Sequence, residues 1–266
     1  MRLALWQTQG FPADIYANLA ALDTQLRAAA AGGAQLLLCP ELWLGGYQVP
    51  EAMAELAEAM DGPAAQRIAA LCRTHGVAVC YGYAERNPSG GKPYNSAQVI
   101  DANGQRVTNY RKLHLFGTME RELFSPGEQL EAPVELNGWR IALLICFDVE
   151  FPEIVRSHAL AGADLVLIPT ALTPEYRAVP ELIVPTRALE NQLFVAYCNH
   201  SGVENGLAFL GGSCVASPDG LRLGAVANGD ALLLVDLDRS RRAEWRETFP
   251  YMQWRRPELY GALTNG

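Results

Sequence analysis

Short apolar runs, almost without polar interruptions, alternate along the chain with longer segments whose apolar residues recur at helical spacing. Strands of this kind are typical of a parallel sheet that is covered on both faces. They are predicted at 2–7, 35–39, 77–83, 139–146, 165–168 and 193–198. Helices are predicted between them, at 15–31, 51–60, 63–75, 152–161 and about 180–191. The alternation of the two patterns indicates an α/β fold.

The remaining segments are shorter or more polar. The turn sequence Asp101-Ala102-Asn103-Gly104 predicts a hairpin that leads into a strand at 107–110. Residues 111–127 are polar and predict a loop. Further strands are predicted near 211–217, 222–226 and 231–236. From about residue 239 the chain is rich in aromatic and charged residues with little periodicity, which predicts a tail that packs on a neighbouring subunit or wraps its own domain.

The chain contains a faint internal repeat. The segment 33–40, GAQLLLCP, is echoed by 162–169, GADLVLIP, and each follows an alanine-containing helical segment. Two similar halves favour two sheets packed face to face with helices outside, and one doubly wound sheet is the alternative. No linker rich in Pro, Gly or Ser separates the halves, so we expect a single domain over 1–266.

Composition and charge narrow the classes of function. The chain has 266 residues, 50% of them hydrophobic, and a formal net charge of −8. Nucleic-acid binding requires a basic surface, so no nucleic-acid partner is expected. No apolar run reaches the roughly 18 residues of a membrane helix, and no signal-peptide pattern opens the chain, so we expect a cytoplasmic protein without a membrane partner. The six cysteines show no metal-ligand spacing, so no metal is expected.

Three reactive side chains each follow an apolar strand. Glu41 follows the strand at 35–39, Lys112 the strand at 107–110, and Cys146 the run that ends at Ile145. Ligands of α/β proteins gather at the carboxyl ends of strands, so these three side chains can meet in one site. Each signal is weak when taken singly, because cysteines are often buried and because glutamate and lysine are usually solvated.

Together the three groups can perform acyl transfer. A thiol is mostly protonated at neutral pH, so Glu41 can take its proton as Cys146 attacks a carbonyl carbon, and can return it to the departing nitrogen. Lys112 can stabilise the oxyanion of the tetrahedral intermediate. Cys146 lies at a strand-to-helix turn, where the N–H of Phe147 is a second oxyanion donor.

Three motifs carry a resemblance to a known family. Residues 40–47, 110–117 and 144–153 read PELWLGGY, YRKLHLFG and LICFDVEFPE. In this order they resemble the nitrilase (carbon–nitrogen hydrolase) superfamily, and the likeness covers nearly the whole chain. The resemblance implies a four-layer αββα sandwich of two mixed sheets with pseudo-twofold related halves. It also implies a Glu-Lys-Cys triad at Glu41, Lys112 and Cys146, with Glu120 as a second glutamate that orients triad and substrate.

The resemblance also implies properties beyond the triad. Members of the family need no metal or organic cofactor, and they usually form dimers through the helix after the cysteine, here 152–161, and through C-terminal segments. A homodimer or higher homo-oligomer is therefore expected, with 240–266 as a tail involved in subunit packing.

Within the family the chain is most similar to bacterial 5-aminopentanamidases and related linear-amide amidases. Phe147 replaces the tyrosine usual in that branch, which removes a hydroxyl from the pocket but keeps the N–H. The expected reaction is hydrolysis of a short linear primary amide, such as 5-aminopentanamide, through a thioester on Cys146. An N-carbamoyl-amine hydrolase or ω-amidase is the enzymatic alternative, and a catalytically silent scaffold or a peroxide-sensing thiol protein is the alternative of another class.

Other residues carry weaker signals. We expect Phe147 and Tyr47 to contact substrate. Neither His114 nor His200 is expected to be catalytic. Glu150 and Glu153 are expected to form structural ion pairs. Three residues lie in loops that can reach the mouth of the site: Glu175, Tyr176 and Glu204. An acidic residue there would suit a substrate with a terminal amine, and the sequence does not choose among them.

Overall fold

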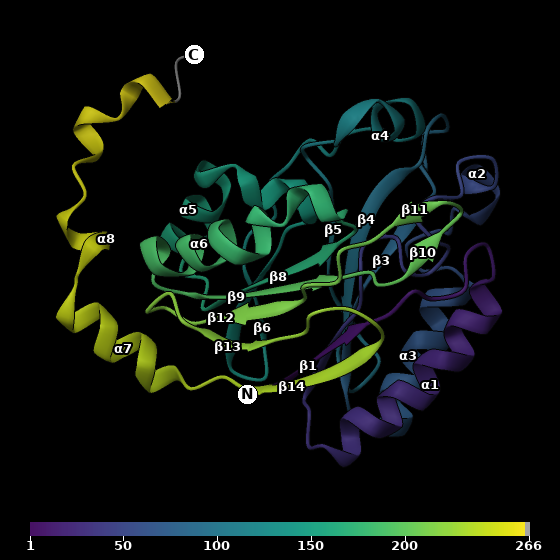
Figure 1. The fold of residues 1–266 in the computed structure, drawn as a ribbon, viewed down its shortest axis with the longest axis horizontal. Coiled ribbons are helices and arrows are strands. Elements are labelled where there is room, and N and C mark those ends of the chain that lie inside the picture. The colour runs from purple at the N-terminus through teal and green to yellow at the C-terminus, as the bar shows by residue number, and fades with distance from the viewer. Residues whose placement is uncertain (264–266) are drawn as a thin grey trace.

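Two mixed six-stranded sheets pack face to face with helices on both outer sides (Figure 1). The computed structural model describes residues 1–263. The first sheet contains, in order, β14 (Ala231–Asp236), β1 (Arg2–Gln7), β2 (Leu36–Leu38), β3 (Ala78–Glu85), β4 (Tyr94–Ile100) and β5 (Arg106–Arg111). The second contains β13 (Arg222–Ala225), β12 (Cys214–Ala216), β9 (Phe194–Asn199), β8 (Leu165–Thr170), β7 (Trp139–Leu143) and β6 (Val134–Leu136). The predicted four-layer αββα sandwich is confirmed.

The two halves follow the same plan. In the first sheet β1, β2 and β3 are parallel and β4 and β5 follow antiparallel. In the second sheet β7, β8 and β9 are parallel and β12 and β13 follow antiparallel. Each sheet is completed by an antiparallel strand on its other edge, β14 or β6. The repeat in the sequence therefore reflects two equivalent sheets, and the alternative of one doubly wound sheet is wrong.

The helices form the outer layers. In Figure 1, α1 (Ile15–Ala31) and α3 (Pro63–His75) lie on one side of the sheets, and α5 (Pro152–Leu160) and α6 (Val184–Asn191) lie on the other. Smaller elements complete the fold: α2 (Met53–Leu56), α4 (Gly117–Leu123), α7 (Arg239–Thr248), α8 (Tyr251–Trp254), β10 (Val203–Glu204) and β11 (Leu207–Ala208). Within residues 1–263, no helix combines the length and the apolar character needed to cross a bilayer.

The period-two alternation of a strand explains why the buried strands are apolar on both faces. On β1, Leu3 and Leu5 belong to the apolar cluster between the two sheets. Their neighbours Ala4 and Trp6 belong to a second cluster with residues of α1 and α3. Both faces of this strand are therefore removed from water, and the hydrophobic effect holds the layers together.

Several boundaries differ from the sequence prediction. The helix predicted at 51–60 is reduced to the single turn of α2, and the loop predicted at 111–127 contains α4. The tail, predicted to lack periodicity, contains α7 and α8. The strand predicted at 139–146 ends at Leu143, because the chain then turns toward α5. These are short elements whose state is decided by tertiary contacts rather than by local pattern.

Gly82 on β3 lets the loop that carries Glu41 lie directly on the sheet. Its N–H donates to Pro40 O at 3.2 Å, and its own carbonyl accepts from Leu44 N at 3.1 Å. A Cβ at this position would lie 2.7 Å from Pro40 O and 2.8 Å from Glu41 C, which are backbone atoms. Only glycine therefore permits this close approach of loop and strand.

We expect Gly82→Ala to lower the free energy of unfolding by roughly 1–3 kcal/mol, because the extra methyl overpacks against backbone that has no free side chain to move. Gly45→Ala is the matched control, since its Cβ would approach no atom closer than 3.4 Å. Urea unfolding of both variants tests the prediction. Equal stability of the two would contradict it.

Candidate active site

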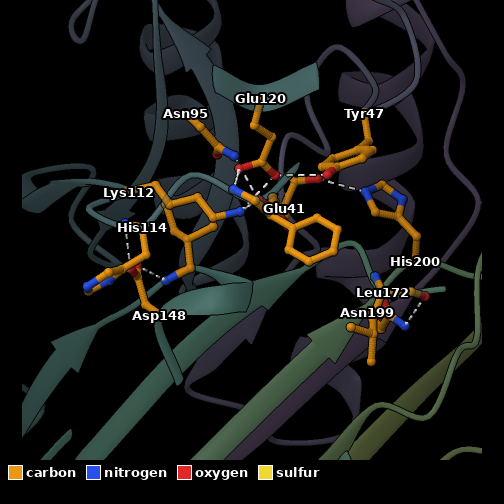
Figure 2. Close-up of polar contacts among 12 residues, drawn as sticks. Glu41, Tyr47, Asn95, Lys112, His114, Glu120, Asp148, Leu172, Asn199 and His200 are labelled. Carbon is orange, nitrogen blue, oxygen red and sulfur yellow. Dashed lines mark hydrogen bonds and ion pairs between the residues drawn. The ribbon is translucent and has the colours of Figure 1, made fainter. Parts of the chain in front are cut away.

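The centre of the site is the ammonium of Lys112, which lies between two carboxylates (Figure 2). Its Nζ donates to Glu41 Oε1 at 2.7 Å and to Glu120 Oε1 at 2.8 Å. All three side chains are fully buried. Lys112 directly follows β5, Glu41 lies in the loop after β2, and Glu120 lies on α4, so three distant segments supply one ion network.

Further hydrogen bonds hold each carboxylate in place. Asn95 Nδ2 donates to Glu41 Oε1 at 2.7 Å. Tyr47 Oη donates to Glu120 Oε1 and Phe116 N to Glu120 Oε2, both at 2.8 Å. The second oxygen of Glu41, Oε2, is buried and has no hydrogen-bond partner among residues 1–263. One oxygen of Glu41 is thus anchored, and the other remains available to accept a proton.

Burial and the neighbouring charges set the protonation states. Burial raises the pKa of Glu41 to about 7, although Lys112 acts to lower it. Burial also acts to lower the pKa of Lys112, but Glu41 and Glu120 outweigh it and raise that pKa above its usual value. Lys112 is therefore a permanent cation, and Glu41 is poised to gain or lose a proton near neutral pH.

Cys146 begins a short 3₁₀ helix, η1 (Cys146–Glu150), that joins β7 to α5. Its φ of 45° lies in the left-handed region, which costs energy for a residue with a Cβ and is found most often at functional sites. The Phe147 N–H follows in the first turn, where helical N–H groups have no intrahelical acceptor. As predicted, Pro152 opens the next helix.

Asp148 holds this turn in place. Its buried carboxylate accepts from Ile145 N at 3.1 Å and from Tyr110 Oη at 2.7 Å through Oδ2. Its other oxygen accepts from His114 N at 3.0 Å and lies 2.7 Å from His114 Nδ1. These contacts tie the strained turn to the end of β5, so Asp148 fixes Cys146 relative to Lys112.

The thiol is in the neutral form in this environment. Burial and then the carboxylate of Glu41 raise the pKa of Cys146 well above its usual value, while Lys112 acts in the opposite direction. A thiol of this kind needs a base to become a nucleophile. Glu41, whose charge influences Cys146, has a free carboxylate oxygen that can accept a proton.

Cys146 opens into a small, largely apolar cavity of about 270 Å³. Phe147, Phe116 and Tyr176 form an aromatic wall, in which the ring centroids of Phe116 lie 5.2 Å from Phe147 and 5.4 Å from Tyr176. The cavity is lined by Tyr47, Gln48, Phe116, Gly117, Thr118, Met119, Cys146, Phe147, Glu150, Ala171, Leu172, Thr173, Tyr176 and Leu207. Its volume lies near the lower end for ligand pockets, which indicates a small ligand.

The structure brings together all six residues predicted for the site: Glu41, Tyr47, Lys112, Glu120, Cys146 and Phe147. The positioning contacts of Asn95 and Asp148 were not predicted from the sequence. Asp148 lies within the motif at 144–153, which is a signal for it, whereas Asn95 lies outside the three motifs. Among the described residues, no group of three or more His, Cys, Asp and Glu side chains is arranged to hold a metal.

The two histidines, His114 and His200, contact residues that support the triad. His114 Nδ1 lies 2.7 Å from Asp148 Oδ1, so this ring contacts the carboxylate that holds the Cys146 turn. His200 Nε2 donates to Glu41 O at 2.7 Å, and burial lowers the pKa of His200 to about 4, so it is a neutral support for the Glu41 loop.

The residues predicted to reach the mouth of the site differ in their positions relative to the cavity. Glu175 is exposed and Glu204 is buried, and neither lines the cavity, whereas Tyr176 and Glu150 do. Within residues 1–263, Glu150 and Glu153 form no ion pair, so the expectation of structural ion pairs for these two is wrong. Arg187, which donates to the backbone of η1, pairs with Glu190 instead.

Comparison with solved structures shows the same fold in an amidase. The chain superposes on the NitN amidase from Nesterenkonia sp. AN1 with a TM-score of 0.88 and 39% sequence identity, covering 99% of both chains. A mutant of that amidase, 38% identical over 99% of both chains with a TM-score of 0.88, is described with acrylamide added at its active-site cysteine.

Comparison with characterised sequences gives the same assignment. A protein of Pseudomonas protegens described as a hydrolase in the pqqF 5′ region is 46% identical over 99% of this chain and 92% of its own length. An (R)-stereoselective amidase of a Pseudomonas species is 34% identical over 99% of this chain and 94% of its own. The model of the carbon-nitrogen hydrolase family matches residues 2–247. This chain belongs to the carbon-nitrogen hydrolase family, the nitrilase superfamily, and is a hydrolase of that family.

Proposed function

We propose that the protein hydrolyses a short linear primary amide to a carboxylate and ammonia through a thioester on Cys146. One observation carries the proposal: a permanent ammonium lies 2.7 Å and 2.8 Å from two buried carboxylates, beside a thiol that opens into a small apolar cavity. This set combines a nucleophile, a base and an electrophile.

In the first half of the reaction the amide becomes a thioester. Cys146 Sγ attacks the carbonyl carbon as its proton moves to the free Oε2 of Glu41, and the carbonyl electron pair moves to oxygen. Lys112 and the Phe147 N–H stabilise this oxyanion. The intermediate then collapses, the C–N bond breaks, and Glu41 returns the proton to the leaving nitrogen, which departs as ammonia.

In the second half water replaces ammonia. Glu41 takes a proton from a water molecule, whose oxygen attacks the thioester carbon, and the same two donors hold the second oxyanion. The C–S bond breaks, the sulfur recovers the proton from Glu41, and the carboxylic acid leaves and ionises. Glu120 positions Lys112 throughout, because it accepts a hydrogen bond from the ammonium. Tyr47 in turn holds Glu120 by donating to its carboxylate.

The preferred substrate we propose is an ω-amino amide such as 5-aminopentanamide. The small cavity with an apolar wall suits a short alkyl chain, and a carboxylate in its lining suits a terminal ammonium. Other relatives act on other amides by their names, such as the 2-oxoglutaramate amidase of Bacillus subtilis, 34% identical over 85% of this chain and 87% of its own. Release of ammonia without carbon dioxide separates an amidase from an N-carbamoyl-amine hydrolase.

We also propose that one domain spans 1–266 and that its tail pairs two copies into a homodimer. The tail, yellow in Figure 1, runs past α5 and α6 and away from the sheets. Beyond α7 it presents Trp254, Leu259 and Leu263 with 67%, 62% and 67% of their surfaces exposed. Three large apolar side chains exposed to this degree within residues 254–263 suit a protein interface. The six free, buried cysteines suit the reducing cytoplasm, where we place the protein.

Cys146→Ala should lower the rate of ammonia release from 5-aminopentanamide by at least roughly a thousandfold, because no thioester can form. Circular dichroism should show an unchanged fold. Cys72→Ala, which removes a buried thiol of α3, is the control and should retain turnover. Full turnover by the Cys146 variant would refute the proposal.

The dependence of kcat/KM on pH should show an acid limb with an apparent pKa near 7. Below the pKa of about 7 the Glu41 carboxyl is protonated and cannot accept the thiol proton, so kcat/KM should fall about tenfold per pH unit. Because Glu41, Lys112 and Glu120 are coupled, this value belongs to the group as a whole. Glu153→Gln should keep the limb, and a flat profile between pH 5 and 8 would argue against Glu41 as the base.

The double variant Trp254→Ala, Leu259→Ala should shift the protein from dimer to monomer in sedimentation velocity, because it removes two exposed apolar side chains of the tail. Leu221→Ala, which alters an exposed leucine elsewhere, should remain dimeric. A wild-type protein that is monomeric at micromolar concentration would contradict the dimer.

A further inference from the structure

The described lining of the apolar cavity includes one carboxylate side chain, Glu150, which is not part of the Glu41-Lys112-Cys146 triad. Among the described residues that line it, Glu150 is the only one with a carboxylate, and none of them is lysine, arginine or histidine. Its neighbours in the lining include Phe147, Phe116 and Leu207, which are apolar. A lone carboxylate in an apolar wall has a desolvation cost, so its position requires an explanation.

The geometry of η1 explains how Glu150 reaches the cavity. In a 3₁₀ helix, side chains three residues apart lie on the same face. Phe147 and Glu150 have this spacing and both line the cavity. At about 2.0 Å of rise per residue, the backbone of Glu150 lies about 8 Å along the axis from that of Cys146. The same short helix thus presents a nucleophile at one end and an anion at the other.

No described group neutralises this anion. The Glu150 carboxylate accepts no hydrogen bond and forms no ion pair within residues 1–263, whereas its backbone carbonyl accepts from Arg187 Nη2 at 2.9 Å. Arg187 also donates to Val149 O and pairs with Glu190. Burial raises the pKa of Glu150, while Arg187 and Lys112 act to lower it.

The other nearby cation is also occupied. Lys112 is held between Glu41 and Glu120 and makes no contact within 4 Å with the carboxylate of Glu150. The two acidic residues of the mouth region are poorer candidates for a cation site. Glu175 is exposed outside the lining, and Glu204 Oε1 accepts from Gln48 N at 2.8 Å. Glu150 is therefore the carboxylate best placed to meet a cation inside the cavity.

We infer that Glu150 binds the terminal ammonium of the substrate and sets the preference for ω-amino amides. This inference rests on the proposed amidase function and assigns a residue to its specificity. An extended peptide spans roughly 3.5 Å per residue of three bonds, which is about 1.2 Å per bond. Five bonds join the amide carbon of 5-aminopentanamide to its ammonium nitrogen, so these two atoms lie about 6 Å apart in the extended substrate. The methylenes then lie along Phe147 and Phe116, and the ammonium reaches Glu150.

Two substrates of equal size isolate the charge. Hexanamide differs from 5-aminopentanamide by a methyl group in place of the ammonium. The wild-type enzyme should have a higher kcat/KM for the amino amide. In Glu150→Gln the ratio of the two kcat/KM values should fall at least tenfold, mainly through KM of the amino amide, because the ion pair between carboxylate and ammonium is lost and only a hydrogen bond from the ammonium to a neutral amide remains. Glu153→Gln, an exposed neighbour in α5, is the matched control and should keep the wild-type ratio.

Charge reversal gives a second readout that a misfolded variant cannot produce. Glu150→Lys should prefer 5-amino-5-oxopentanoate, whose far end is a carboxylate, over 5-aminopentanamide, and so invert the wild-type order. A Glu150→Gln ratio equal to that of wild type would overturn the inference. A wild-type enzyme with the same kcat/KM for hexanamide and for the amino amide would also overturn the inference. That result would leave the proposed amidase function intact. An enzyme that releases ammonia from no amide would instead refute the proposed function itself.

Discussion

The active site depends on one buried ammonium shared by two carboxylates. Taking each of these ions out of water costs several kcal/mol, and only mutual pairing with good hydrogen-bond geometry offsets that cost. Lys112 meets this condition with contacts of 2.7 Å and 2.8 Å, and Asn95 and Tyr47 satisfy further lone pairs of its partners. The network therefore holds its shape, and the loops that carry Glu41 and Glu120 are held with it.

The same network determines the chemistry. Burial is the main cause that makes Glu41 easier to protonate, the ammonium of Lys112 opposes it, and the carboxylate of Glu120 adds to it. A base with a pKa near the working pH can both accept and return a proton, which acyl transfer requires twice. Because burial raises the pKa of the Cys146 thiol, the proposed mechanism requires Glu41 to take the thiol proton as the sulfur attacks.

The site also lies at the seam between the two sheets. Glu41 and Lys112 come from the first half of the chain and Cys146 from the second, and the Glu41 N–H donates to Thr170 O at the end of β8. Asp148 makes a second link across this seam through Tyr110 and His114. The packing of the sheets therefore sets the spacing between base, cation and nucleophile.

Several features were accessible from the sequence because they are local. Continuous apolar runs follow from strands buried on both faces, and the echo of 33–40 in 162–169 follows from two equivalent sheets. The positions of Glu41, Lys112 and Cys146 directly after strands, together with the motifs around them, predicted one site. Each of these signals depends only on residues that are close along the chain.

Other features depended on contacts between distant segments, which no local pattern records. Glu150 and Glu153 look alike in the sequence, yet only Glu150 lines the cavity, because the three-residue repeat of η1 places it on the face of Phe147. Likewise α4 forms within a polar stretch, where Glu120 is buried against Lys112. The sequence by itself determined which residue types stand at the strand ends, whereas the tertiary structure alone decided which carboxylates are buried, paired or left open, since burial is set by the packing of distant segments.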